Sequence, residues 1–245
     1  MIKRINLNQL KDCYSDNGFL KLKLLNSKEF KQIKFIVLKK IFNLLELNKY
    51  TNSNISYKNF NWSKYHFYVD RFKLKHNSIL TSKNRHFNKN EFKNTILKKK
   101  NILNFFQNIV EKKLMFWNEG LGEFAFRIIR PNHNDGYPWS CKKWGPAKNV
   151  VSIWLPIISF KNPHTIALWP FSHKKKLSNY LPTNSKFEKK ELRLVKSPPF
   201  SEVLRPNLTR GEIILFHQNL QHSENVINGN NTRINLEFRL KIIDK

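Results

Sequence analysis

A histidine and an arginine near the carboxyl end of the chain are the residues with the clearest chemical implication. Gly211, Glu212 and a short apolar run ending at Phe216 predict a strand, and His222 follows just beyond the tip of that strand. Arg233 comes 11 residues after His222, at the start of a second apolar segment. An imidazole beside a guanidinium suits a site that holds a divalent metal ion and clamps a carboxylate through a bidentate pair. We therefore expect His222 and Arg233 to share one site.

This C-terminal block resembles that of the phytanoyl-CoA dioxygenase-like family of Fe(II)/2-oxoglutarate-dependent oxygenases. In that family, Gly-Asp/Glu opens a short strand ending in Phe, the distal metal histidine follows, and an arginine at the spacing of Arg233 binds the far carboxylate of 2-oxoglutarate. Three upstream segments are also similar to family motifs: Trp154-Leu155-Pro156 to W-x-P, Pro170-Phe171-Ser172-His173 to P-G-S-H with Phe171 in place of Gly, and Asp16-Asn17-Gly18-Phe19 to D-G-F/Y. The resemblance spans most of the chain.

The resemblance implies an enzyme that uses Fe(II) and 2-oxoglutarate to hydroxylate a C–H bond of a small metabolite. It assigns His222 to the metal and Arg233 to the co-substrate. Arg239 lies six residues beyond Arg233, hence on the same face of the predicted strand, and is a reserve residue for binding an anion. The partner that we expect is thus a small molecule, which the two arginines would favour as an anion.

The family's third element is a His-x-Asp motif, which completes a face of two histidines and one carboxylate and leaves iron open positions. One candidate is His133-Asn134-Asp135, whose spacing places both functional side chains on one face of an extended segment. Asp135 is the sole aspartate of residues 121–245 apart from Asp244. If the chain binds iron in the family manner, the expected ligands are His133, Asp135 and His222.

A second alignment follows the residues around the motif. Family members often carry Pro-Trp or Tyr-Trp before His-x-Asp and an aromatic residue and Gly shortly after it, and Pro138-Trp139 and Trp144-Gly145 fit that frame. Ser140 and Lys142 then stand where His and Asp should be, and a Lys ammonium repels Fe(II). Asn-Asp-Gly at 134–136 is a turn signal, which favours this non-binding alternative. The sequence leaves both alignments open.

The elements that must position these residues change character along the chain. Beyond Gly122, short apolar runs split by Pro, Gly and Asn indicate a β sandwich or barrel, with strands predicted at 124–130, 150–157, 165–169, 201–204, 212–217 and 233–242. Upstream, alternating residues predict a strand at 18–24, and helical spacing predicts helices at about 26–47 and 92–117. The patternless stretch 48–90 offers a candidate strand at 65–72.

Together these elements predict a mixed α+β, mainly β fold. We expect a double-stranded β-helix, the jelly-roll or cupin-like barrel, with N-terminal helices packed outside it. The chain is expected to form one domain over 1–245, with residues 1–120 as a helical or mixed wrap and 121–245 as the barrel core.

Composition limits the function classes. The formal net charge is +28, but Lys is spread through every segment among Asn and Ile, which indicates a chain-wide bias rather than a nucleic-acid-binding face. The two cysteines, Cys13 and Cys141, lie too far apart in sequence to indicate a disulfide framework or a zinc site. The longest apolar stretch is too short for a bilayer and no signal segment is evident, so we expect a cytoplasmic protein without a membrane partner.

Three functions therefore compete. The first is an Fe(II)/2-oxoglutarate-dependent oxygenase of a small metabolite. The second is a non-catalytic homologue that needs no cofactor, retains the barrel and keeps an anion site at Arg233 and Arg239. The third is a basic polyanion-binding protein, which rests on net charge alone.

Overall fold

The computed structural model describes residues 6–45, 55–74, 76–92, 94–96, 101–117, 124–142, 149–180, 192–224 and 229–243. Its main feature, within these residues, is a seven-stranded antiparallel sheet in the order β1-β9-β5-β11-β4-β2, with β3 also paired to β11. The strands are β1 Phe19–Lys23, β2 His86–Phe87, β3 Lys113–Phe116, β4 Phe124–Ile129, β5 Val150–Ile158, β9 Glu212–Phe216 and β11 Arg233–Ile243. Two short pairs lie apart from it: β6 Ala167–Leu168 with β10 His222–Ser223, and β7 Asn179–Tyr180 with β8 Arg193–Leu194.

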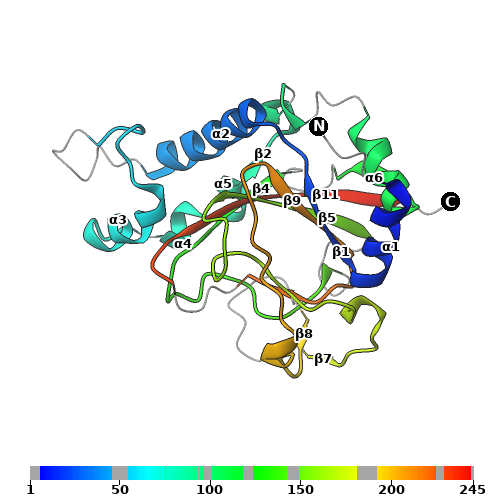
Figure 1. The fold of residues 1–245 in the computed structure, drawn as a ribbon. Coiled ribbons are helices and arrows are strands. Elements are labelled where there is room, and N and C mark those ends of the chain that lie inside the picture. The colour runs from blue at the N-terminus through cyan, green and yellow to red at the C-terminus, as the bar shows by residue number, and fades with distance from the viewer. Residues whose placement is uncertain are drawn as a thin grey trace.

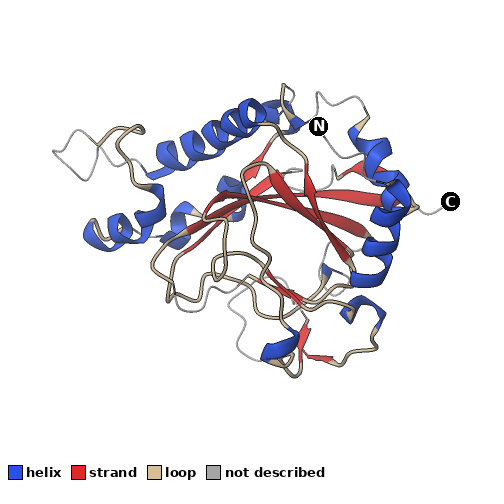
Figure 2. Ribbon diagram, viewed as in Figure 1, coloured by secondary structure: helices blue, strands red, loops and turns tan. Residues whose placement is uncertain are grey.

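Helices cover one face and the ends of the large sheet. They are α1 Leu7–Asn17, α2 Ser27–Leu45, α3 Tyr65–Arg71, α4 His76–Ile79, α5 Ser82–Arg85 and α6 Ile102–Val110, with 3-10 turns at Trp62–Lys64, Lys89–Phe92, Ser172–Lys174 and Phe200–Glu202. Figure 1 shows α2 lying across one face and α1 with α6 at one end of the sheet. The opposite face is covered by loops and the short strands (Figure 2).

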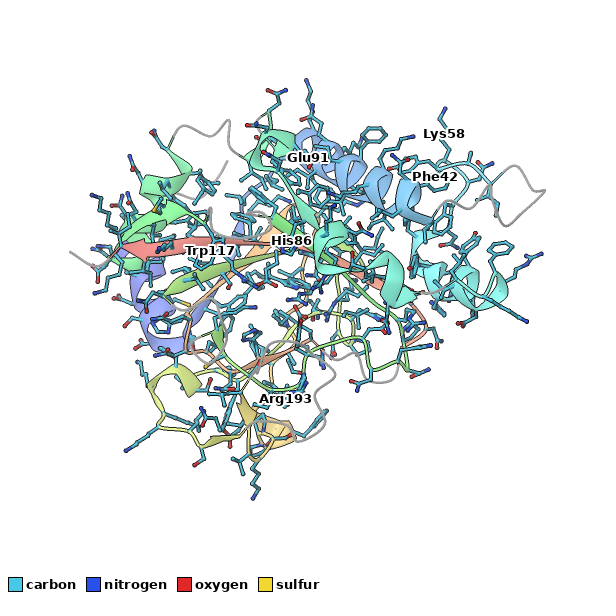
Figure 3. All side chains as sticks on the ribbon, turned by 180° about the vertical axis from the view of Figure 1, so that it is seen from behind. Phe42, Lys58, His86, Glu91, Trp117 and Arg193 are labelled. Atoms are coloured by element: carbon cyan, nitrogen blue, oxygen red, sulfur yellow. The ribbon has the colours of Figure 1, made fainter. Side chains whose placement is uncertain are left out.

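Different layers cover the two faces of the sheet. The outer face looks toward α2 and belongs to the large apolar cluster, to which β11 contributes Ile234, Leu236, Phe238 and Leu240. The inner face holds the alternate residues of each strand and a smaller apolar cluster built on Trp154, Ile214 and Phe216. Figure 3, a view from behind, places Phe42 and Glu91 on the α2 side and Arg193 on the other side of the sheet. Alternation along one strand thus separates an apolar layer from a polar one.

Most of the predicted framework is confirmed. The strands at 18–24, 124–130, 150–157, 212–217 and 233–242 correspond to β1, β4, β5, β9 and β11, the strand at 165–169 is reduced to β6, and the first helix is α2. The expectation of a mixed fold of helices and β-sheet is confirmed, the large sheet is antiparallel, and closure of the sheets into a barrel stays a prediction. In the described ranges, every helix is too short or too polar to span a membrane.

Three predicted elements were wrong. The candidate strand at 65–72 is helix α3, because Tyr65 and Val69 bury one helical face and the backbone N–H of His66 bonds the Thr232 hydroxyl. The helix at 92–117 is interrupted: α6 ends where Glu111 takes a positive φ, and residues 113–116 pair with β11 instead. The segment 201–204 follows two prolines and forms a 3-10 turn, with a single bridge at Leu204. Helix α1 was not predicted, since its surface is largely polar.

Candidate functional site

His222 lies on the inner side, in a backbone ladder that also contains Ser140. The Ser140 N–H donates to the His222 carbonyl at 3.1 Å, and the His222 N–H donates to the Ser140 carbonyl at 3.0 Å. The ladder continues to the Glu224 N–H, which donates to the Tyr137 carbonyl at 2.9 Å. Residues 137–140 therefore run antiparallel beside residues 222–224, and Ser140 is the residue directly opposite His222.

The His222 side chain is buried and held in one orientation. Its Nδ1 lies 2.9 Å from the Leu220 carbonyl oxygen, which can only accept, so Nδ1 carries the proton and Nε2 keeps its lone pair. Burial, reinforced by the nearby charge of Lys142, lowers the pKa of His222 to about 3. The imidazole is therefore neutral at physiological pH, with one basic nitrogen.

Lys142 and Glu237 form an ion pair beside this imidazole. The Lys142 Nζ lies 2.9 Å from Oε1 of Glu237, and both side chains are largely buried. Nε of Arg239 lies 3.3 Å from Oε1 of the same carboxylate, and Nε of Arg127 lies 3.4 Å from its Oε2. Nε of Arg127 also lies 3.1 Å from Oε1 of Glu224. Burial raises the pKa of Glu237, but the three cations more than offset this and hold it well below its ordinary value. The centre of the inner face is thus a charged network anchored on β11.

Asp135 is part of a separate cluster. Its two oxygens accept from Nε and Nη2 of Arg130, both at 2.8 Å, and Oδ2 also accepts from the Arg130 backbone N–H at 2.9 Å. Nε2 of His76 lies 3.6 Å from Oδ2, and Nδ1 of His76 bonds the Tyr65 hydroxyl at 3.1 Å. Nδ1 of His133 bonds the carbonyl of Pro131 at 2.8 Å. The polar side chains of the turn at 131–136 thus bond residues of the turn and its flanks, and Asp135 also lies near His76 of α4, which bonds Tyr65 of α3.

The fit of a divalent metal can be judged from these placements. His133, Asp135 and His222 are all described, and among the described residues no group of three or more His, Cys, Asp or Glu side chains could hold a metal ion. Around His222 stand a serine and an ion-paired lysine, which offer a weak ligand and a repelling charge. The residues beside His222 do not fit Fe(II). The ligand set His133, Asp135 and His222 stays a prediction that metal titration can test.

Arg233 presents the opposite situation, a cation for which the described residues supply no hydrogen-bond partner. Its side chain is 0% exposed, and Nε, Nη1 and Nη2 have no hydrogen-bond partner among the described residues. Its guanidinium carbon lies 5.7 Å from the ring centroid of Trp154, whose indole N–H is also unpartnered within the described part of the chain. Burial lowers the pKa of Arg233 to about 10, so the group stays charged at neutral pH. A carboxylate with two oxygens matches such a fork, so Arg233 fits the carboxylate of 2-oxoglutarate.

Arg239, unlike Arg233, has an ion-pair partner. It pairs with Glu237, and 28% of its side chain is exposed. Sequence reasoning missed Arg127, Glu224, Asn235 and Glu237. Asn235 and Glu237 could have been found, because both share the parity of Arg233 on one predicted strand. Trp144-Gly145, which supported the second alignment, lie outside the described residues.

Solved structures of other proteins share the fold of this chain. No protein-family model and no curated protein matches the chain. Among solved structures, the carbocyclase SnoK of nogalamycin biosynthesis, a non-heme α-ketoglutarate-dependent enzyme, matches with a TM-score of 0.57 at 9% identity, over 99% of this chain and 86% of its own. The non-heme monooxygenase ThoJ matches with a TM-score of 0.56 at 12% identity, over 95% and 77%. EctD from S. alaskensis, solved with 2-oxoglutarate and 5-hydroxyectoine, matches with 0.53 at 13% identity, over 98% and 77%.

These likenesses establish the fold alone. The chain shares its fold with these enzymes, of which SnoK is α-ketoglutarate-dependent and EctD was solved with 2-oxoglutarate, and this agrees with the general fold that the C-terminal motif predicted.

Proposed function

We propose that this protein is a phytanoyl-CoA dioxygenase-like homologue that binds a small carboxylate at Arg233 without using iron. The observation that carries the proposal is the ladder in which Ser140 stands opposite His222, with Lys142 paired to Glu237. In this proposal the second alignment of the His-x-Asp region is the correct one. The oxygenase fold is retained and its metal chemistry is lost.

The electrostatics of the inner face support this assignment. Fe(II) bound at His222 would meet the positive charge of Lys142, which already acts on this imidazole, and Glu237, which lies near it, pairs with three cations. Asp135, which the iron hypothesis requires, is occupied by a bidentate pair with Arg130. Freeing it would leave the partly buried guanidinium of Arg130 unpaired, which is destabilising.

The unpaired Arg233 supports the binding of an anion. A buried charge without a partner is destabilising, and a ligand carboxylate is the group that would offset that cost. A bidentate carboxylate would use two of the three nitrogens of Arg233 that have no partner in the described part of the chain, and the Trp154 indole N–H is a nearby donor. Arg233 is 0% exposed, so the contact would form in a medium of low dielectric constant, which strengthens it.

Metal titration tests the loss of the iron site. Under anaerobic conditions with 2-oxoglutarate, the native protein is expected to show no metal-to-ligand charge-transfer band with Fe(II) and no thermal stabilisation by Co(II). Ser140→His combined with Lys142→Asp rebuilds two ligands opposite His222, and this double variant is expected to gain both signals. Adding Asp135→Asn to the double variant is the matched control, which should leave metal binding unchanged.

An intact iron site would reverse these results. If the native protein gives the charge-transfer band and Asp135→Asn abolishes it, the chain binds Fe(II) and 2-oxoglutarate with Asp135 as a ligand, as the first alignment predicts, and the proposal is wrong.

Calorimetry in the presence of EDTA tests the carboxylate site. Glutarate and 2-oxoglutarate are expected to bind the native protein and to bind Arg233→Met at least about tenfold more weakly, because a charge-assisted bidentate pair is lost. Arg239→Met is the matched control, since it removes an arginine from the same face of β11 that is already paired. Equal binding by the native protein and Arg233→Met would exclude Arg233 as the anion site.

A further inference from the structure

Asn235 is a second buried polar side chain of the inner face that makes no hydrogen bond to the described residues. It lies on β11 two residues after Arg233, so both side chains leave the strand on the same face. The residue is 0% exposed, and neither Oδ1 nor Nδ2 has a hydrogen-bond partner among the described residues. A buried amide lacking both of its hydrogen bonds is unusual, because burial of polar groups is normally compensated.

The strands on either side of Asn235 do not supply these bonds. On β4 its register partner is Arg127, whose guanidinium is held by Glu224 and Glu237. On β5 its partner is Pro156, which has no N–H and an apolar ring. The amide is therefore positioned by the sheet but left for a group that the described protein does not provide.

A carboxylate alone cannot satisfy this amide. Carboxylate oxygens only accept, so they can receive a bond from Nδ2 but cannot donate to Oδ1. A hydroxyl or a carboxamide both donates and accepts, and so matches an asparagine side chain. The ligand group that Asn235 calls for is thus chemically distinct from the one that suits Arg233.

We propose that the ligand of the Arg233 site also carries a hydroxyl or carboxamide group, which Asn235 binds. This inference rests on the proposed function and defines its ligand as a short hydroxy acid or the monoamide of a diacid. Residues two apart on a strand are separated by about 7 Å. A ligand of four or five carbons, with the carboxylate at one end and the second polar group at the other, spans that distance.

The test compares ligands that differ in one group. With EDTA present, pentanoate, 5-hydroxypentanoate and glutaric acid monoamide are titrated into the native protein by calorimetry. The hydroxyl or amide compound is expected to bind about tenfold more tightly than pentanoate, because pentanoate leaves the Asn235 amide unbonded. Asn235→Leu, which is close in volume, is expected to reduce this preference to less than about twofold while pentanoate binds as before. Urea denaturation of the unliganded variant checks that it folds, and it should be at least as stable as the native protein.

Other outcomes would contradict either this inference or the proposed function on which it rests. If the native protein binds the three compounds equally, or binds glutarate more tightly than both polar compounds, Asn235 does not read a second group and the inference is wrong. If Asn235→Leu weakens all three equally, the amide binds the carboxylate itself, which is also contrary to the inference. If no compound binds in a manner that depends on Arg233, the proposed function has failed rather than this extension of it.

Discussion

The two faces of β11 are both buried, and their side chains are stabilised in different ways. Toward α2 the strand presents only apolar residues, which pack into the large cluster: Ile234, Leu236, Phe238 and Leu240. Toward β10 it presents two arginines, an asparagine and a glutamate, of which Arg233 and Asn235 lack partners among the described residues. Apolar residues of this strand thus stabilise the fold, while two polar residues between them remain buried without hydrogen bonds to the described side chains. Such local violations of good packing are expected where a protein binds something.

The largest effect should come from the outer face. Phe238→Ala removes a fully buried ring that lies 5.0 Å from Phe124, centroid to centroid, and is expected to lower the free energy of unfolding by about 4 kcal/mol, measured by urea denaturation. Arg233→Met, five residues away on the same strand, is expected to cost nothing or to stabilise, because it removes a buried charge that has no partner among the described residues. A loss at Arg233 as large as that at Phe238 would show that the guanidinium has a partner in the unliganded protein.

A slightly smaller effect is expected where the inner face is paired. Glu237→Gln leaves Lys142, Arg127 and Arg239 without their shared carboxylate, and should cost about 3 kcal/mol. Adding Lys142→Met to this variant removes one unpaired cation and should recover part of the loss. If the double variant is no more stable than Glu237→Gln alone, the Lys142 ammonium is solvated rather than held by Glu237.

The sequence predicted some features of the two faces of β11 and missed others. Short apolar runs split by Pro, Gly and Asn predicted β11, and the family resemblance carried by His222 and Arg233 predicted a general fold that the solved structures support. The partner of His222 could not be derived, because the ladder with Ser140 joins segments far apart in sequence and depends on where the turn at 131–136 ends. Helix α3 was missed since its aromatic residues favour strands locally, and only tertiary burial makes them helical.

The cluster around Asp135 is paired, unlike Arg233, and it should make stability depend on pH. Burial lowers the pKa of His76 to about 4, so between pH 7 and 5 the unfolded chain takes up a proton at this residue and the folded chain does not. Stability therefore falls as the pH is lowered through this window. The pKa of Asp135 lies below its ordinary value, since hydrogen bonds from Arg130 outweigh its burial, and it contributes nothing to the change above pH 5.

His76→Gln isolates this contribution. The loss of unfolding free energy between pH 7 and pH 5 should shrink by about 2 kcal/mol in the variant, whatever its stability at pH 7. Urea midpoints at the two pH values give the comparison. An unchanged pH dependence would mean that His76 is protonated in the folded state and forms a full ion pair with Asp135.

The smallest effect tests whether the layer over the outer face depends on local structure or on burial. At the start of α2, the Asn26 side chain accepts from the Glu29 N–H at 2.9 Å, and the Glu29 carboxylate accepts from the Asn26 N–H at 2.8 Å. This reciprocal capping is exposed, so Asn26→Ala should cost only about 1 kcal/mol in urea denaturation. Asn26→Ser keeps the cap and should cost less. If Asn26→Ala instead approaches the cost of Phe238→Ala, α2 is held over the sheet chiefly by its first turn, and burial of its apolar side chains against the outer face contributes less than the packing indicates.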